Sequence, residues 1–157
     1  MVGSLVSFRQ SQQPPRRQSL LSAYITHPDC ARHEMGPHHP ECPERLGAIQ
    51  DHLLVKGLLD YMLPHDAPLA TEEQLSQAHS SLYIKELLAA SPTEGYYALD
   101  PDTNMNPYTI KAALRAAGAA VHATDLVMRG EVSTAFCSVR PPAFAFSTTW
   151  PWASAMP

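Results

Sequence analysis

The densest group of side chains that could bind a metal or move a proton lies between His27 and Leu46. This stretch holds four of the eight histidines, two of the three cysteines and four prolines. Neutral imidazole and thiolate are the usual zinc ligands, but the paired Cys-x-x-Cys and His-x-x-x-His brackets of a zinc finger are missing. Two interpretations follow from the residues alone: a surface loop stiffened by proline, or a local zinc site. The best ligand set for that site is Cys30, His33, His39 and Cys42.

Regular elements flank this loop on both sides. Residues 22–26 are β-prone and are followed by His27-Pro28, which predicts a short buried strand. Residues 44–56 predict a helix, with Pro43 suited to its first turn and Gly57 to its C-terminal cap. We expect one buried stripe on that helix, formed by Leu46, Ile49, Leu53 and Leu54.

Three more helices are predicted further along. Thr71 and Gln74 have the form of a capping box that opens a short helix through Ala78. Residues 81–90 predict a helix that turns Leu82, Ile84, Leu87 and Leu88 towards the core. The longest helix is predicted from Asn106, as N-cap, to Arg129, with Gly130 ending it and Gly118 allowing close approach of a neighbour. Its expected apolar stripe is Ile110, Leu114, Ala117, Val121 and Met128.

A second buried strand is predicted at residues 133–139. A strand, then helices, then a strand is the pattern of an open α/β sheet with parallel strands. Two strands cannot complete such a sheet, so we expect an incomplete one that exposes apolar edges and self-associates.

The order of several short segments resembles a known family. The string His38-His39-Pro40-Glu41-Cys42-Pro43-Glu44-Arg45-Leu46 is similar to the first loop and helix of the zinc-dependent histone deacetylase and acetylpolyamine amidohydrolase family. The later segments, in the family's order, are residues 78–83, 99–107, 116–119 and 135–142. The resemblance covers residues 22–142, is strongest to bacterial histone deacetylase-like proteins, and implies the N-terminal part of a three-layer arginase/deacetylase-type domain with a parallel sheet.

The resemblance also implies which residues an active member needs. The family hydrolyses acetyl-lysine or acetylpolyamine amides with one zinc, held by an Asp-x-His pair and a later Asp. Its general bases are adjacent histidines in an Arg-Pro-Pro-Gly-His-His-Ala motif, and a later tyrosine stabilises the oxyanion. Here the match stops at Arg140-Pro141-Pro142, and residues 141–157 contain no Asp, Glu, His, Cys, Lys or Arg. We therefore expect no catalytic residue and no zinc in this chain.

Three residues match positions around the family's pocket. Arg45 matches an arginine of the acetate exit channel, and Asp100 and Asp102 match a substrate-facing loop. The alternatives are a solvated arginine in the first turn of a helix, and carboxylates that shape the turn around Pro101.

Three functional hypotheses remain. The first is a truncated deacetylase-family protein without activity of its own. The second is a small non-catalytic binding module whose His/Cys loop holds a metal. The third is an enzyme of another class that uses His27, His38 or His39, although no Gly-x-Ser-x-Gly motif is present.

Composition limits the partners and the compartment. A net charge of -4 gives no electrostatic case for nucleic acid or a membrane surface, and three distant cysteines favour a reducing, cytoplasmic setting. Residues 1–21 have the composition of a disordered leader, a targeting segment or a start placed too early.

Residues 143–157 are predicted to be a tail foreign to the family, with a frameshift near Pro142 as one explanation. In the frame that begins at the third base of the Trp150 codon, the following bases allow Ala-Met-Gly-Phe-Cys. The family has this string shortly after its histidine pair. Neither alternative frame allows Gly-His-His directly after Pro142, so a single base change does not restore the motif.

Overall fold

A computed structural model describes residues 21–37 and 39–139. In that part of the chain the elements are β1 (Ser22–Thr26), α1 (Glu44–Val55), β2 (Met62–Asp66), α2 (Glu72–Ser76), α3 (Ser81–Ala89), β3 (Tyr97–Asp100), β4 (Thr103–Met105), α4 (Thr109–Met128) and β5 (Thr134–Ser138). Short 3-10 turns at Pro28–Arg32 and Leu59–Tyr61 follow β1 and precede β2. The expectations for the leader, for His38 and for the tail lie outside the described residues.

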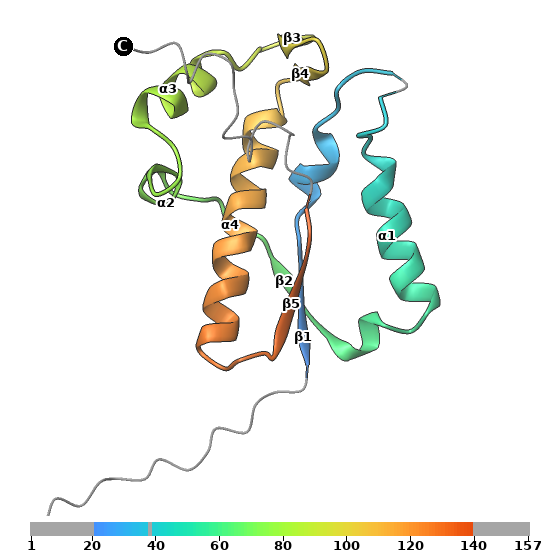
Figure 1. The fold of residues 1–157 in the computed structure, drawn as a ribbon. Helices are drawn as coiled ribbons and strands as arrows, with labels where there is room; N and C mark the ends of the chain where they lie inside the picture. Colours follow the sequence, from blue (N-terminus) through green and yellow to red (C-terminus); the bar gives the residue numbers. More distant parts are fainter. Residues whose placement is uncertain (1–20, 38, 140–157) are drawn as a thin grey trace, which may run out of the picture.

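The larger sheet has the order β2-β1-β5, and both pairings are parallel. The connection from β1 to β2 leads one way across the sheet, and the connection from β2 to β5 leads back past β1. Right-handed crossovers in opposite directions place their helices on opposite faces. Figure 1 shows this arrangement, with α1 on one side of the sheet and α4 on the other. The predicted parallel α/β sheet is confirmed.

The core lies between this sheet and α4. Ala23 and Ile25 of β1 pack with Ala119 and Leu126 of α4, and all four are buried. Gly118 is also buried, and it lies against the backbone of the segment that follows β2. Small side chains let helix and sheet approach closely, so the predicted close approach at Gly118 is confirmed.

The predicted apolar stripe of α4 is wrong as a description of its buried face. The buried residues of the helix are Thr109, Ala112, Ala116, Gly118, Ala119 and Leu126. Ile110, Leu114 and Ala117 instead line a cavity of about 140 Å³ between α4 and the helices α2 and α3. Met128 is exposed. The periodicity marked the larger side chains, whereas the sheet accepts the smaller ones.

The stripes predicted for α1 and α3 are also less buried than expected. Helix α1 has no buried residue, and Leu54 on its stripe is 62% exposed. A space of about 490 Å³, lined by Tyr24 of β1 and Gln50 of α1 among others, separates this helix from the sheet. In α3 only Ile84 is buried, whereas Leu82 and Leu88 are exposed. Periodicity identifies an apolar face but does not supply the neighbour that would cover it.

Two of the predicted helix caps are confirmed and a third is wrong. Thr71 and Gln74 form the capping box of α2, which ends at Ser76 rather than Ala78. Gly57 follows α1 with φ of 66°, and its N–H donates to Leu54 O at 2.9 Å. The start of α4 differs, because the helix begins at Thr109 and Asn106 is not its N-cap.

Three of the observed strands are not predicted by the sequence pattern. β2 has the sequence Met-Leu-Pro-His-Asp, and proline is tolerated there because β2 is an outer strand among the described residues. β3 and β4 form a short antiparallel hairpin with an irregular register between Ala98 and Asp100. None of these three strands has the alternating apolar pattern that identifies a strand.

Candidate functional site

The first loop leaves β1 at His27, at the carboxyl end of the parallel sheet. Ligand sites of open α/β sheets form at this end. Three groups of polar contacts hold the loop against α4 and against the β3–β4 hairpin.

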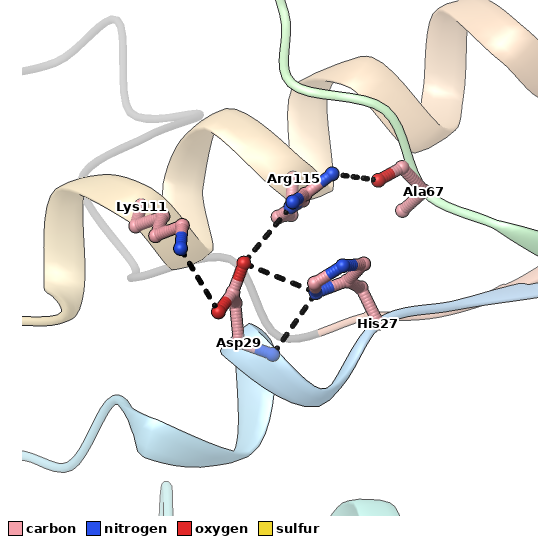
Figure 2. A network of polar contacts seen from close by, with 5 residues as sticks. All are labelled: His27, Asp29, Ala67, Lys111 and Arg115. Carbon is pink, nitrogen blue, oxygen red and sulfur yellow. Dashed lines mark hydrogen bonds and ion pairs between the residues drawn. The ribbon is translucent and has the colours of Figure 1, made fainter.

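A charged network at Asp29 makes the first connection (Figure 2). Arg115 Nε lies 3.1 Å from Asp29 Oδ2, and Lys111 Nζ lies 3.3 Å from Oδ1. Arg115 also donates from Nη1 to Ala67 O at 2.7 Å, which joins the segment after β2 to the network. His27 Nδ1 lies 3.1 Å from both the backbone nitrogen and Oδ2 of Asp29.

The pKa of Asp29 is lowered from its ordinary value of 3.8. Burial by itself raises this pKa, but the hydrogen bonds from Arg115 and Lys111 and the nearby charges favour the carboxylate and outweigh it. The network therefore fixes the loop through a buried, ionised carboxylate.

Asp29→Asn should lower the free energy of unfolding at neutral pH by about 2 kcal/mol, because two charge-assisted hydrogen bonds lose their charge. A carboxyl whose pKa is lowered by folding stabilises above its unfolded-state pKa, and this contribution is lost as the pH falls through the folded-state value. The difference between the unsubstituted chain and the variant should therefore be constant above about pH 5 and shrink below about pH 4. Denaturant unfolding across this range measures it.

Asp51→Asn, on the exposed surface of α1, is the matched control and should show no such pH dependence. A difference at Asp29 that persisted undiminished well below pH 4, roughly the ordinary range of a carboxyl, would contradict the ionised network.

A buried cluster at the start of α4 makes the second connection. Thr109 Oγ1 accepts from Asn106 N at 2.8 Å and donates to Asn106 Oδ1 at 3.0 Å. His33 Nδ1 lies 2.8 Å from the same hydroxyl. Because the single hydroxyl proton goes to Asn106, the His33 ring donates from Nδ1 in this arrangement. Asn106 Nδ2 also donates to Arg32 O at 2.9 Å, so this asparagine joins the loop to α4 instead of capping the helix.

Contacts with the β3–β4 hairpin make the third connection. Asn104 Nδ2 donates to Met35 O at 3.0 Å, and Tyr96 OH donates to Glu34 Oε1 at 2.8 Å. The contact with Glu34 raises the pKa of Tyr96, because the neighbouring carboxylate disfavours the phenolate. The loop and the hairpin therefore form one polar surface at the carboxyl end of the sheet.

The three residues matched to the family's pocket lie on or beside this surface. Arg45 is half-exposed and pairs with Glu41 four residues earlier. Asp100 Oδ1 accepts from Asp102 N at 2.7 Å, the turn-forming role given as the alternative. The Asp102 side chain is 95% exposed, and its Oδ1 lies 3.4 Å from His39 Nε2.

The four residues of the alternative loop site do not converge. His33 is committed to Thr109, and His39 Nδ1 accepts from Glu41 N at 3.0 Å. Within residues 21–37 and 39–139, no group of three or more His, Cys, Asp or Glu side chains is placed to hold a metal ion. The described part of the chain gives the loop zinc site no support.

Asp29, Lys111 and Arg115 are site residues that the sequence pattern alone does not predict. A signal was present, because Lys111 and Arg115 stand four residues apart and so share one face of the long helix. Asp29 directly follows the predicted strand, at the end of the sheet where polar groups gather. The pairing needed the helix and the sheet to be placed relative to one another.

Comparisons with known proteins agree with this architecture. The family model of the histone deacetylase domain matches residues 39–144. A probable deacetylase of Archaeoglobus fulgidus is 31% identical over 128 residues, which cover 78% of this chain and 34% of that protein. The polyamine deacetylase HDAC10 of Mus musculus is 40% identical over 108 residues, which cover 65% of this chain and 16% of that protein.

Structural similarity points the same way. The crystal structure of the HDA15 HD domain matches with a TM-score of 0.71 and 28% sequence identity, and the match covers 79% of this chain and 36% of that one. The fold is thus part of a deacetylase-type α/β domain, as predicted. The chain belongs to the histone deacetylase family, and its match spans about a third or less of the relatives' length. None of the helices described is long and apolar enough to cross a membrane.

Proposed function

We propose that this chain supplies the first loop and the substrate-facing rim of a deacetylase-type domain, and that by itself it does not hydrolyse acetylated amines. The observation that carries the proposal is the absence of metal-binding and proton-transferring side chains after Arg140. Residues 141–157 provide no strong zinc ligand and no general base where the family's histidine pair and metal ligands are expected. The residues present in this stretch do not fit the family's zinc, so they do not support a zinc-dependent hydrolysis.

The rim is the part of the site that the chain does contain. The exposed Asp102 carboxylate beside His39 supports a position on a substrate-facing surface for the hairpin that carries Asp100 and Asp102. Arg45, at the first turn of α1, is proposed to border the exit channel. The relatives named as polyamine and probable deacetylases support acetylated lysine or polyamine as the substrate class of the complete domain.

The compartment proposed is the cytoplasm. Cys30, Cys42 and Cys137 are all free thiols, as expected in a reducing setting.

The competing binding-module hypothesis predicts zinc that survives dialysis and is lost in a Cys30→Ser, Cys42→Ser double variant.

The test of the proposed function is turnover of an acetyl-lysine peptide and of an acetylated polyamine by the purified 157-residue chain. No turnover above the uncatalysed rate is expected for either substrate. Measurable turnover by the chain alone would overturn the proposal.

The exposed sheet edges predict self-association. Among the described residues β2 and β5 each pair on one side only, and Phe136 on β5 is 40% exposed. Unpaired edges with apolar side chains recruit other strands, and a charge on the edge blocks this. Light scattering after size exclusion should give an average mass that rises with concentration for the unsubstituted chain and falls back to that of the monomer for Phe136→Lys.

Val127→Lys is the matched control, because Val127 is 39% exposed but lies on the helix α4 and not on a strand. It should leave the association unchanged. A strictly monomeric unsubstituted chain would contradict the prediction.

A further inference from the structure

A histidine pair outside the first loop joins the outer strand β2 to α4. His122 Nε2 lies 3.3 Å from His65 Nδ1, and the two rings meet edge to face with centroids 5.3 Å apart. The two residues are 57 positions apart in the sequence, so only the fold brings them together. Within residues 21–37 and 39–139, the structure gives neither imidazole another hydrogen bond or ion pair.

The separation of the two nitrogens is the one that a shared metal ion requires. Two imidazole nitrogens bound to one tetrahedral Zn²⁺ at about 2.0–2.1 Å each lie about 3.3–3.4 Å apart. A hydrogen bond between the rings accounts for the same distance in the absence of metal. A bound cation would displace the shared proton and lie to one side of the line between the two nitrogens, because a metal on that line would need about 4 Å between them. Imidazole nitrogen is a preferred ligand of zinc, copper and nickel.

Access and backbone support are also present. Both histidines are half-buried, so the rings are held by the fold while one side stays open to water. His65 lies in register with Ile25, one of the most buried residues of the core, which fixes the strand position that presents it. Half-buried side chains on a strand and a helix lose little freedom when they bind, which favours chelation by two ligands.

We propose that His65 and His122 form a binding site for a divalent first-row transition cation, with water completing its coordination. The site is independent of the proposed function, because it uses none of the loop or hairpin residues. Bound metal would link the outer strand to the helix and stabilise the folded chain, since the unfolded chain does not hold the two imidazoles together.

The test is titration of the purified 157-residue chain with NiCl₂, followed by calorimetry and by the side-chain ¹⁵N signals of the histidines. Ni²⁺ is chosen because it prefers imidazole and does not oxidise thiols. The expected result is one equivalent bound, broadening of the His65 and His122 signals first, and a melting temperature that rises with Ni²⁺ and returns on adding EDTA.

The variants decide whether the pair is the site. His65→Gln and His122→Gln should each weaken binding by about tenfold or more, because a single imidazole cannot chelate. His52→Gln, on the exposed surface of α1, should bind as the unsubstituted chain does. Far-ultraviolet circular dichroism checks that each variant is folded. Unchanged affinity in folded His122→Gln, first broadening at other histidines, or no binding by the unsubstituted chain would overturn the proposal.

Discussion

Gly118→Ala is expected to lower the free energy of unfolding by about 3 kcal/mol, the cost of overpacking at a rigid site. A Cβ at this position would lie 2.0 Å from Pro68 O, 2.8 Å from Pro68 C and 2.9 Å from Ala70 N. All three are backbone atoms, so no side-chain rotation relieves the clash. The segment cannot move away freely, because Ala70 N donates to Leu114 O at 2.9 Å on the same helix. Urea unfolding followed by circular dichroism measures the change.

Gly47→Ala is the matched control, since it makes the same change in another helix. An added Cβ at Gly47, in the exposed surface of α1, would meet nothing within 4 Å. Replacing glycine by alanine in an open helical position stabilises by about 0.5–1 kcal/mol. The two substitutions should therefore have opposite signs, and equal effects would contradict the packing of α4 against the segment after β2.

Arg115→Met is expected to cost about 3 kcal/mol, as does the removal of one partner from a buried ion pair. The Arg115 and Asp29 side chains are only 18% and 11% exposed, and the guanidinium also bonds Ala67 O. Methionine keeps most of the aliphatic volume but leaves Asp29 Oδ2 and Ala67 O without the donor that Arg115 supplies. Denaturant unfolding at neutral pH measures the loss.

Lys111→Met is the control on the same carboxylate. The Lys111 side chain is 51% exposed, so solvent screens its pair with Asp29, and a loss below about 1 kcal/mol is expected. Comparable losses for the two variants would show that burial does not set the strength of this network.

The sequence predicted the positions of helices and strands better than it predicted which of their residues are buried. Residues 22–26 and 133–139 were identified as strands and observed as β1 and β5, because each is a short apolar run bounded by breakers. β2 was not predicted, because Pro64 and the polar residues after it are atypical of a strand, although an outer strand tolerates them. The buried face of α4 was missed because alanine and glycine carry almost no hydrophobic signal.

Contacts between residues close in the sequence could be predicted, whereas contacts between distant residues could not. The capping box at Thr71 and the turn at Asp100 depend on neighbours within three residues, so spacing was enough to indicate them. The Asp29–Arg115 pair joins residues that are 86 positions apart, and the His65–His122 pair joins residues that are 57 positions apart. Such contacts follow from topology and could not be identified from spacing.

The central claim is that this chain contains the rim of a deacetylase-type site without its hydrolytic centre. The most direct test is acetate release from an acetyl-lysine peptide by the purified 157-residue chain supplied with zinc. A zinc-dependent deacetylase that is active on the same peptide serves as the positive control. The account predicts acetate release at the rate of buffer alone. Release above that rate, abolished by a zinc chelator, would contradict it.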